Sequence, residues 1–205
     1  MPTVAVAPQA VKTSQQSRRR TRADWRALPE GPPYFELIDG EFVELARPQR
    51  NHDRLSNKIY VLLDSVIEAH GLGELSREPN LYLDGTEDVY HPDFAFIAVG
   101  SSAVYQEDGI HGTPDMVCEI LSPDTVHVDR GRKRTVYGQA GVRHLWLISP
   151  QSPIKIEEHV LTDAGQYVVR ATVSAPDIWE PEAFPGWTVS LLDLERAVSR
   201  PRPTP

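Results

Sequence analysis

Two acidic residues lie in segments that are otherwise apolar, and their surroundings point to metal or phosphate chemistry. Glu119 lies within Met116-Val-Cys-Glu-Ile-Leu121, and Asp93 immediately precedes the apolar run Phe94–Val99. A buried carboxylate without a partner costs much free energy, so each acid needs a compensating charge or donor. A divalent cation is one solution, because Mg²⁺ prefers one or two carboxylates together with waters and phosphate oxygens. The alternative is structural: each acid caps a strand end or pairs with an arginine.

Asp115 competes with Asp93 for a metal-binding role, since it also follows a proline and shares a strand face with Glu119. Four residues of strand, however, span roughly 13 Å, whereas metal–oxygen distances are about 2 Å. Asp115 and Glu119 therefore cannot bind one ion together, and we expect Asp115 to begin its strand. Asp93, on a neighbouring strand, can approach Glu119 across a single strand spacing.

Lys133 belongs to a predicted helix over residues 126–140 that has few apolar residues. Asp129, Lys133 and Tyr137 are spaced i, i+4, i+8 and form one stripe, while Arg130 and Arg134 form a second. A solvated helix with an internal Asp–Lys pair explains this spacing without catalysis. If the first stripe instead faces the two acids, Lys133 would stabilise the charge that develops on a phosphate during hydrolysis.

The elements that would position these residues alternate between α and β patterns. The segment Tyr34–Leu45 predicts two strands joined at Asp39-Gly40, a dipeptide typical of hairpin turns. Apolar residues at helical spacing predict a helix over residues 52–69, and Gly71 follows as its end. Further strands are predicted over residues 75–83, 94–99, 115–121 and 145–148, the last of them central because it is entirely apolar.

Towards the C-terminus, residues 154–161 and 166–173 predict a second hairpin, and residues 184–194 a closing strand or extended segment. The whole pattern predicts an α/β fold of the α+β kind, with helices packed on a mixed sheet. The strand, helix and strand between residues 115 and 148 are expected to form a right-handed crossover. Asp124 or Thr125 is the expected N-cap of that helix.

Length and composition restrict the class of protein. The chain has 205 residues, 40% of them hydrophobic, which fits one domain with a packed core. We expect this domain over residues 30–195, between a disordered basic arm (residues 1–29) and a disordered tail (residues 196–205). The single cysteine, Cys118, rules out an intrachain disulfide, and no apolar run reaches the roughly 18 residues that span a bilayer. These features predict a soluble, cytoplasmic protein that does not associate with membranes.

The charge is distributed unevenly along a chain of net charge −8. Residues 1–29 contain six Lys/Arg and one acid, whereas residues 30–205 contain 15 Lys/Arg and 28 acids. An acidic body repels phosphates, so a nucleic acid would need a local basic patch or bridging metal ions. The arginine-rich segment Arg18–Arg22 could contact nucleic acid, although a solvated arm is the simpler interpretation.

Together these residues resemble the bacterial restriction endonuclease family called Uma-two, within the PD-(D/E)xK nuclease superfamily. The resemblance is carried, in chain order, by Pro92-Asp93, Glu119-Ile-Leu-Ser-Pro, Asp129-Arg-Gly-Arg-Lys133 and Tyr137–Pro150. The segment Tyr34–Glu41, with His52 ahead of a helix, and the segment Phe184–Leu194 are similar to the family's N- and C-terminal signatures. The match covers residues 30–195.

The resemblance implies a restriction-endonuclease-like core with an N-terminal hairpin and a C-terminal β-hairpin extension. It also implies Mg²⁺- or Mn²⁺-dependent hydrolysis of phosphodiester bonds, with Asp93 and Glu119 as the catalytic, metal-binding acids and Glu41 as a further ligand. The superfamily lysine expected two residues after Glu119 is replaced here by Leu121. The resemblance implies that Lys133 supplies this lysine from the following helix.

The leading hypothesis is therefore a metal-dependent endonuclease whose substrate is nucleic acid, with DNA favoured over RNA. In this hypothesis His52 or Asp129 orients Lys133 or the attacking water, and Arg130 and Arg134 support substrate binding. A homodimer would suit the cutting of two strands. Two alternatives remain open: a catalytically inactive binding or regulatory module with the same fold, and a hydrolase that acts on a small phosphate ester.

Overall fold

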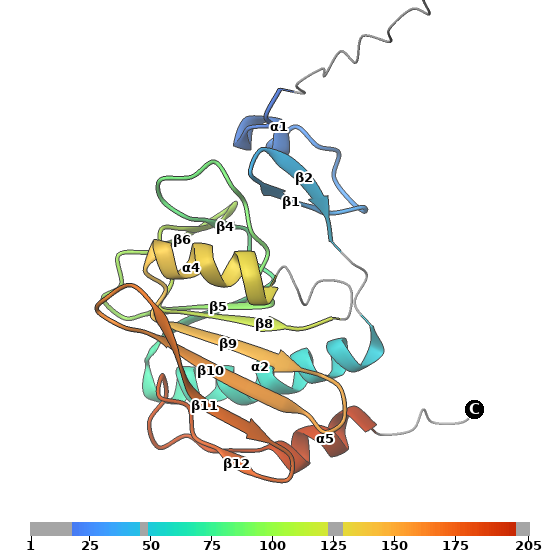
Figure 1. Cartoon of the computed structure of the whole chain (residues 1–205), viewed down its shortest axis with the longest axis vertical. Coiled ribbons are helices and arrows are strands. Elements are labelled where there is room, and N and C mark those ends of the chain that lie inside the picture. The colour runs from blue at the N-terminus through green and yellow to red at the C-terminus, as the bar shows by residue number, and fades with distance from the viewer. Residues whose placement is uncertain (1–17, 46–48, 123–128, 200–205) are drawn as a thin grey trace, which may run out of the picture.

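The computed structural model describes residues 18–45, 49–122 and 129–199. Its centre is a six-stranded sheet in the order β11-β10-β9-β8-β5-β3 (Figure 1). β8 and β9 run parallel, and the other neighbouring strands of this sheet run antiparallel. The strands are β3 (Gly73–Arg77), β5 (Phe94–Ala98), β8 (Met116–Ile120), β9 (His144–Ser149), β10 (Lys155–Leu161) and β11 (Tyr167–Ser174). The predicted α+β fold with a mixed sheet is thereby confirmed.

Two helices, α2 (Arg50–His70) and α5 (Leu191–Ser199), cover one face of this sheet. α2 is amphipathic, and its buried stripe packs on the sheet; the stripe consists of Leu55, Ile59, Leu63 and Ile67. Gly71 ends the helix in the left-handed conformation, which glycine adopts without a steric penalty. The short strands β12 (Ile178–Trp179) and β13 (Val189–Ser190) pair beside α5.

The opposite face carries η1 (Asp129–Lys133), a single π-helical turn, and α4 (Arg134–Ala140), which continues from it. A three-stranded sheet of β4 (Leu81–Tyr82), β7 (Gly109–His111) and β6 (Val104–Gln106) adjoins them (Figure 1). Val117, Leu121 and Tyr137 meet in the core on this side. Because neighbouring strand residues point to opposite faces, Glu119 faces α4 rather than α2.

An N-terminal hairpin, β1 (Phe35–Ile38) and β2 (Glu41–Glu44), lies beyond this second layer, next to the short helix α1 (Arg22–Arg26). Its turn residues Asp39 and Gly40 have φ angles of 52° and 75°, as expected for the turn that suits the twist of a hairpin. Leu37 and Val89 exchange two backbone hydrogen bonds of 3.0 and 2.9 Å. These bonds join the hairpin to the rest of the protein.

Several sequence predictions for the elements are confirmed. They are the first hairpin, the helix that begins near residue 52, the strands near residues 94–99, 115–121 and 145–148, and the second hairpin, formed by β10 and β11. β9 is central in the sheet, as its apolar sequence indicated. In the described ranges, no helix combines the length and apolar character needed to cross a bilayer.

Other predictions are wrong. The strand predicted over residues 75–83 is broken after β3, because Glu78 has a φ of 48° and Pro79 has no N–H to donate. The segment 184–194 contains only the short β13 before α5 begins. α5 extends to Ser199, into the predicted tail, and α1 lies within the predicted disordered arm. The expected N-caps Asp124 and Thr125 lie outside the described residues.

Candidate active site

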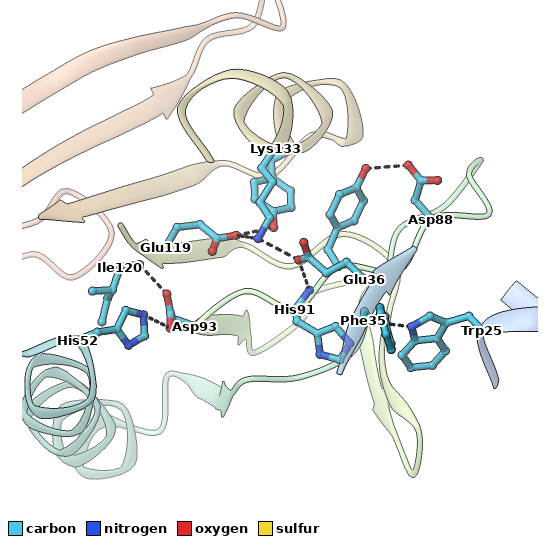
Figure 2. Close-up of polar contacts among 12 residues, drawn as sticks. Trp25, Phe35, Glu36, His52, Asp88, His91, Asp93, Glu119, Ile120 and Lys133 are labelled. Carbon is cyan, nitrogen blue, oxygen red and sulfur yellow. Dashed lines mark hydrogen bonds and ion pairs between the residues drawn. The ribbon is translucent and has the colours of Figure 1, made fainter. Parts of the chain in front are cut away.

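A buried polar network surrounds the ammonium group of Lys133 (Figure 2). Lys133 Nζ lies 2.9 Å from Glu36 Oε1 and 3.3 Å from Glu119 Oε1, and the lysine side chain is only 5% exposed. The Tyr137 hydroxyl donates a hydrogen bond of 2.8 Å to the same oxygen of Glu119. The hairpin thus supplies one carboxylate and the central sheet another, and both contact a single lysine.

The local structure of η1 and α4 explains why Lys133 and Tyr137 act together. Lys133 is the last residue of η1, and Tyr137 lies one turn later in α4. Residues four positions apart lie on one face of a helix, so both side chains reach the same carboxylate of Glu119. π-helical turns are rare in proteins, and those that occur are often found at functional sites. The predicted stripe of Lys133 and Tyr137 therefore faces the central sheet.

Glu36 is held by a second donor besides Lys133. The backbone N–H of His91 donates to Glu36 Oε1 at 2.9 Å, and Glu36 is 3% exposed. The His91 ring contacts Trp25, with the two ring centres 5.8 Å apart. Burial, together with the positive charge of Lys133, lowers the pKa of His91 to about 4. His91 is therefore uncharged at neutral pH and adds no repulsion to the lysine.

Asp93 lies beside this network, at the start of β5 (Figure 2). The antiparallel register pairs Phe94 with Cys118, which places Asp93 level with Glu119 on the neighbouring strand. Asp93 Oδ2 accepts a hydrogen bond of 2.6 Å from the Ile120 N–H, and Oδ1 lies 3.1 Å from His52 Nε2. The carboxylate is thereby fixed at the end of β8, with 12% of the side chain exposed.

His52, near the start of α2, contacts Asp93 through its imidazole ring. Burial acts to lower the pKa of His52, but the hydrogen bond with Asp93 and the negative charges of Asp93 and Asp53 raise it, and the net result is a raised pKa. A small cavity adjoins His52 at the ends of β8 and β9; it is lined by Gln49, Asn51, His52, Leu121, Ser122, Pro150 and Gln151. This cavity adjoins the end of β8 that Asp93 caps.

The structure does not bring every candidate residue to Lys133. Glu41 is exposed at the start of β2, opposite Ile38 in the hairpin register. Glu36 lies on the same face of the hairpin, and it is this acid that reaches the lysine. For Asp129, the first residue of η1, the structure describes no side chain.

The two arginines of the second stripe point towards β10 and β11. Arg130 Nη1 and Nη2 bind the two carboxylate oxygens of Glu157 at 2.5 and 3.1 Å. The hydrogen bonds and charge of Arg130 lower the pKa of Glu157 to about 2, so this carboxylate stays ionised. Arg134 Nη2 donates to the Tyr167 carbonyl at 3.0 Å. Both arginines thus contact β10 and β11 rather than the acids around Lys133.

Sequence reasoning missed Glu36 and His91, and it did not assign Tyr137 to the site. Glu36 could have been found by the pattern that identified Glu119, because it is an acid inside the short apolar strand Phe35–Ile38. His91 and Tyr137 carry no such signal, since their roles depend on contacts between distant segments of the chain.

The chemistry of the donors permits a divalent cation. Among the residues that the structure describes, no group of three or more His, Cys, Asp or Glu side chains is arranged to hold a metal ion. Mg²⁺, however, needs only one or two carboxylates, because waters and phosphate oxygens complete its coordination. Asp93 and Glu119 offer two such hard oxygen donors from level positions of adjacent strands. Their oxygens have the donor chemistry that Mg²⁺ or Mn²⁺ accepts.

Comparison with known proteins places this site in context. The family described as "Uma2: Putative restriction endonuclease" matches residues 22–195. A crystal structure of a putative nuclease belonging to DUF820, from Anabaena variabilis ATCC 29413, superposes with a TM-score of 0.70 at 20% sequence identity. The match covers 87% of this chain and 98% of that one, and at this identity it shows a shared fold. No curated protein matches the chain.

Proposed function

The chain belongs to the Uma2 (Uma-two) family, and from this premise we propose that it is a metal-dependent endonuclease that hydrolyses phosphodiester bonds of nucleic acid, most readily those of DNA. One observation carries the proposal. Asp93 and Glu119 occupy level positions on β5 and β8, and Glu119 contacts the ammonium group of Lys133 at 3.3 Å. Acids that bind a metal and a cation that stabilises phosphate charge are the groups that phosphodiester hydrolysis requires.

Asp93, Glu119 and the main-chain carbonyl of Ile120 would hold the metal, as Mg²⁺ or Mn²⁺. When bound, such an ion lowers the pKa of a water molecule and polarises the scissile phosphate. His52 orients Asp93 through Oδ1, while the Ile120 N–H fixes Oδ2. Tyr137 orients Glu119 in the same way. The protein therefore positions both carboxylates before any substrate is present.

Lys133 would supply positive charge beside the phosphate. Its partner Glu36 keeps the ammonium group in place, because a buried charge is stable only when it is paired. Arg130 and Arg134 contact β10 and β11 and would bind phosphates outside the immediate site. A homodimer with twofold symmetry would present two such sites to the two strands of a duplex.

The decisive experiment replaces Asp93 with Asn. We expect Asp93→Asn to reduce Mn²⁺-dependent cleavage of plasmid DNA at least a hundredfold, because Asn has no negative charge to bind the metal. Asp115→Asn is the matched control, since Asp115 Oδ2 accepts a hydrogen bond from the Ala98 N–H at 2.8 Å, just as Asp93 accepts one from Ile120. Both variants should keep the wild-type melting temperature to within a few degrees.

A panel of substrates then tests whether cleavage depends on the metal and which nucleic acid is preferred. Plasmid DNA, single-stranded DNA, RNA and branched DNA are incubated with and without Mn²⁺, and DNA should be cleaved fastest and only with the metal. Cleavage by Asp93→Asn at the wild-type rate would refute the assignment of the site. If RNA is cleaved faster than DNA, the proposed hydrolysis of phosphodiester bonds is kept, and RNA replaces DNA as the proposed substrate.

A second candidate, a binding module without catalysis, is favoured by the hydrogen bonds in the site. Each of the two acids already has protein donors: Asp93 has the Ile120 N–H and His52, and Glu119 has Tyr137 and Lys133. Calorimetric titration with Mn²⁺ separates the candidates. Heat of binding that Asp93→Asn abolishes favours the nuclease, whereas no heat at millimolar Mn²⁺ favours the binding module.

A further inference from the structure

The N-terminal segment of residues 18–20 lies against the turn of the β1–β2 hairpin. The Arg20 N–H donates to the Gly40 carbonyl at 2.8 Å, and the Arg20 guanidinium lies 5.5 Å from the centre of the Phe42 ring. A Cβ atom at position 40 would lie 2.7 Å from the Cβ atom of Arg19. Glycine at this position therefore allows the close approach, and the arginine segment is an ordered part of this surface.

Four arginines gather at this turn with fewer acids between them. Arg19 and Arg132, which are far apart in the sequence, both form ion pairs with Asp39. Arg18 pairs with Asp24, and the side chains of Arg18 and Arg19 are 68% and 75% exposed. Arg132 also lies 3.9 Å from Asp88, so the four arginines, Arg20 included, have three acidic ion-pair partners, and the group keeps one positive charge in excess in a chain of net charge −8.

This group lies close to the candidate active site. Arg132 immediately precedes Lys133 in η1, and it pairs with Asp39, which lies three residues after Glu36 in the hairpin. The group is therefore held on the two elements, η1 and the β1–β2 hairpin, whose residues Lys133 and Glu36 form the buried ion pair.

We propose that Arg18, Arg19, Arg20 and Arg132 form an arginine clamp that binds the phosphate backbone of the nucleic acid beside the candidate active site. The proposal rests on the proposed nuclease function and extends it, because it assigns the surface that overcomes the repulsion between an acidic protein and a polyanion. Arg19 and Arg132 exchange the shared carboxylate of Asp39 for phosphate oxygens when the nucleic acid binds.

The first test compares two double variants that change the net charge equally. Binding of a fluorescein-labelled DNA duplex is measured by anisotropy in EDTA, over a range of salt concentrations. Arg19→Gln with Arg20→Gln should weaken binding about tenfold and reduce the slope of log K against log salt by about 2, since each lost phosphate contact removes about 0.9. The control is Arg170→Gln with Arg196→Gln, two arginines that are 65% and 69% exposed and pair with Glu182 and Asp193.

The second test removes the docking site and leaves the arginines in place. In Gly40→Asn the new residue tolerates the positive φ of 75°, because asparagine adopts this conformation more readily than most residues. Its Cβ atom, however, displaces Arg19. Gly165→Asn is the matched control, because Gly165 also lies in a hairpin turn, at φ 71°, with no atom within 4 Å of the added Cβ. We expect weaker binding for Gly40→Asn and wild-type binding for Gly165→Asn, with both variants folded by circular dichroism.

The outcomes separate the clamp from the nuclease. If the first double variant and Gly40→Asn bind DNA as tightly as their controls, the clamp is refuted, whether or not the wild-type protein cleaves. If they bind less tightly while the wild-type protein binds but never cleaves, the clamp stands and the proposed catalytic function falls. In an active enzyme, the clamp predicts a higher KM for the first double variant with an unchanged kcat.

Discussion

The ammonium nitrogen of Lys133 lies 2.9 Å from a carboxylate oxygen of Glu36, and both side chains are almost entirely removed from solvent. This contact joins the N-terminal hairpin to the helical layer that follows β8. A buried charge that loses its partner is strongly destabilising, whereas an intact pair contributes little net stability. The pair is therefore better explained by the need to hold a charged lysine at this place than by stability alone.

Replacement of Glu36 by Gln tests this explanation. We expect Glu36→Gln to lower metal-dependent cleavage at least tenfold, because Lys133 loses its closest counter-charge, and to lower the free energy of unfolding by about 1–3 kcal/mol. The loss is moderate because Glu119 still contacts the lysine, and Gln can still accept from the His91 N–H. Plasmid cleavage and urea unfolding measure the two effects.

Glu41→Gln is the control, since Glu41 lies on the same hairpin face but is exposed. We expect its unfolding free energy to change by less than about 0.5 kcal/mol, with cleavage unchanged. The reverse result, in which Glu41→Gln is inactive and Glu36→Gln is active, would show that Glu41 is the functional acid of the hairpin.

Tyr137 can be tested by removal of its hydroxyl. Tyr137→Phe deletes the donor to Glu119 and should cost about 1 kcal/mol of stability, with Mn²⁺ binding weakened about tenfold because the ligand is no longer oriented. Tyr90→Phe is a close control. Tyr90 is equally buried, packs edge-on against Tyr137, and donates to Asp88 at 2.8 Å. Equal weakening of metal binding in both variants would refute a specific role for Tyr137.

His52 should show a raised pKa and a matching dependence of stability on pH. Burial opposes its charged form, but the hydrogen bond and charge of Asp93 favour it, so the folded state has a pKa above 6.5. The stabilisation is therefore fully present below pH 6.5 and is lost as the pH rises through the pKa of the folded state. His52→Gln should destabilise the protein more at about pH 5 than at about pH 8. An NMR titration that gives a pKa below 6.5 would contradict this.

The effect of His91 on the pH dependence of stability should be opposite to that of His52. Burial and the charge of Lys133 lower its pKa from 6.5 to about 4 in the folded protein. Its contribution is present above pH 6.5 and is lost as the pH falls towards 4, because the unfolded chain binds the proton more readily. We expect His91→Gln to reduce the loss of stability between these values, measured by urea unfolding. An unchanged pH profile would mean that His91 is not protonated on unfolding in this range.

The sequence predicted most of the core sheet because its strands are short, apolar and bounded by turn residues. It also predicted that Glu119 and Lys133 lie on neighbouring elements, since the first is an acid within an apolar strand and the second belongs to the next helix. The sequence analysis expected Asp93 and Glu119 to lie on adjacent strands. The pairing of β5 with β8 confirms this and places the two residues level with each other.

What the sequence could not provide is the pairing of distant segments. The hairpin was predicted correctly, but which of its acids would be buried depended on how it docks through Leu37 and Val89. The ordered position of Arg18–Arg20 was missed because the segment has no periodicity, and its conformation depends on Gly40 and Asp39. Similarly, α5 follows β13 directly, and local pattern alone did not separate a strand from a helix there.

Glu36 lies 83 residues before Glu119 in the chain, and it meets Glu119 and Lys133 only after the hairpin has docked on the main body. Closure of so long a loop carries an entropic cost that local structure cannot offset. Under the proposed nuclease function, hydrolytic competence should therefore appear only when the β1–β2 hairpin docks. Recovery of activity during refolding would then report that docking rather than the formation of the sheet.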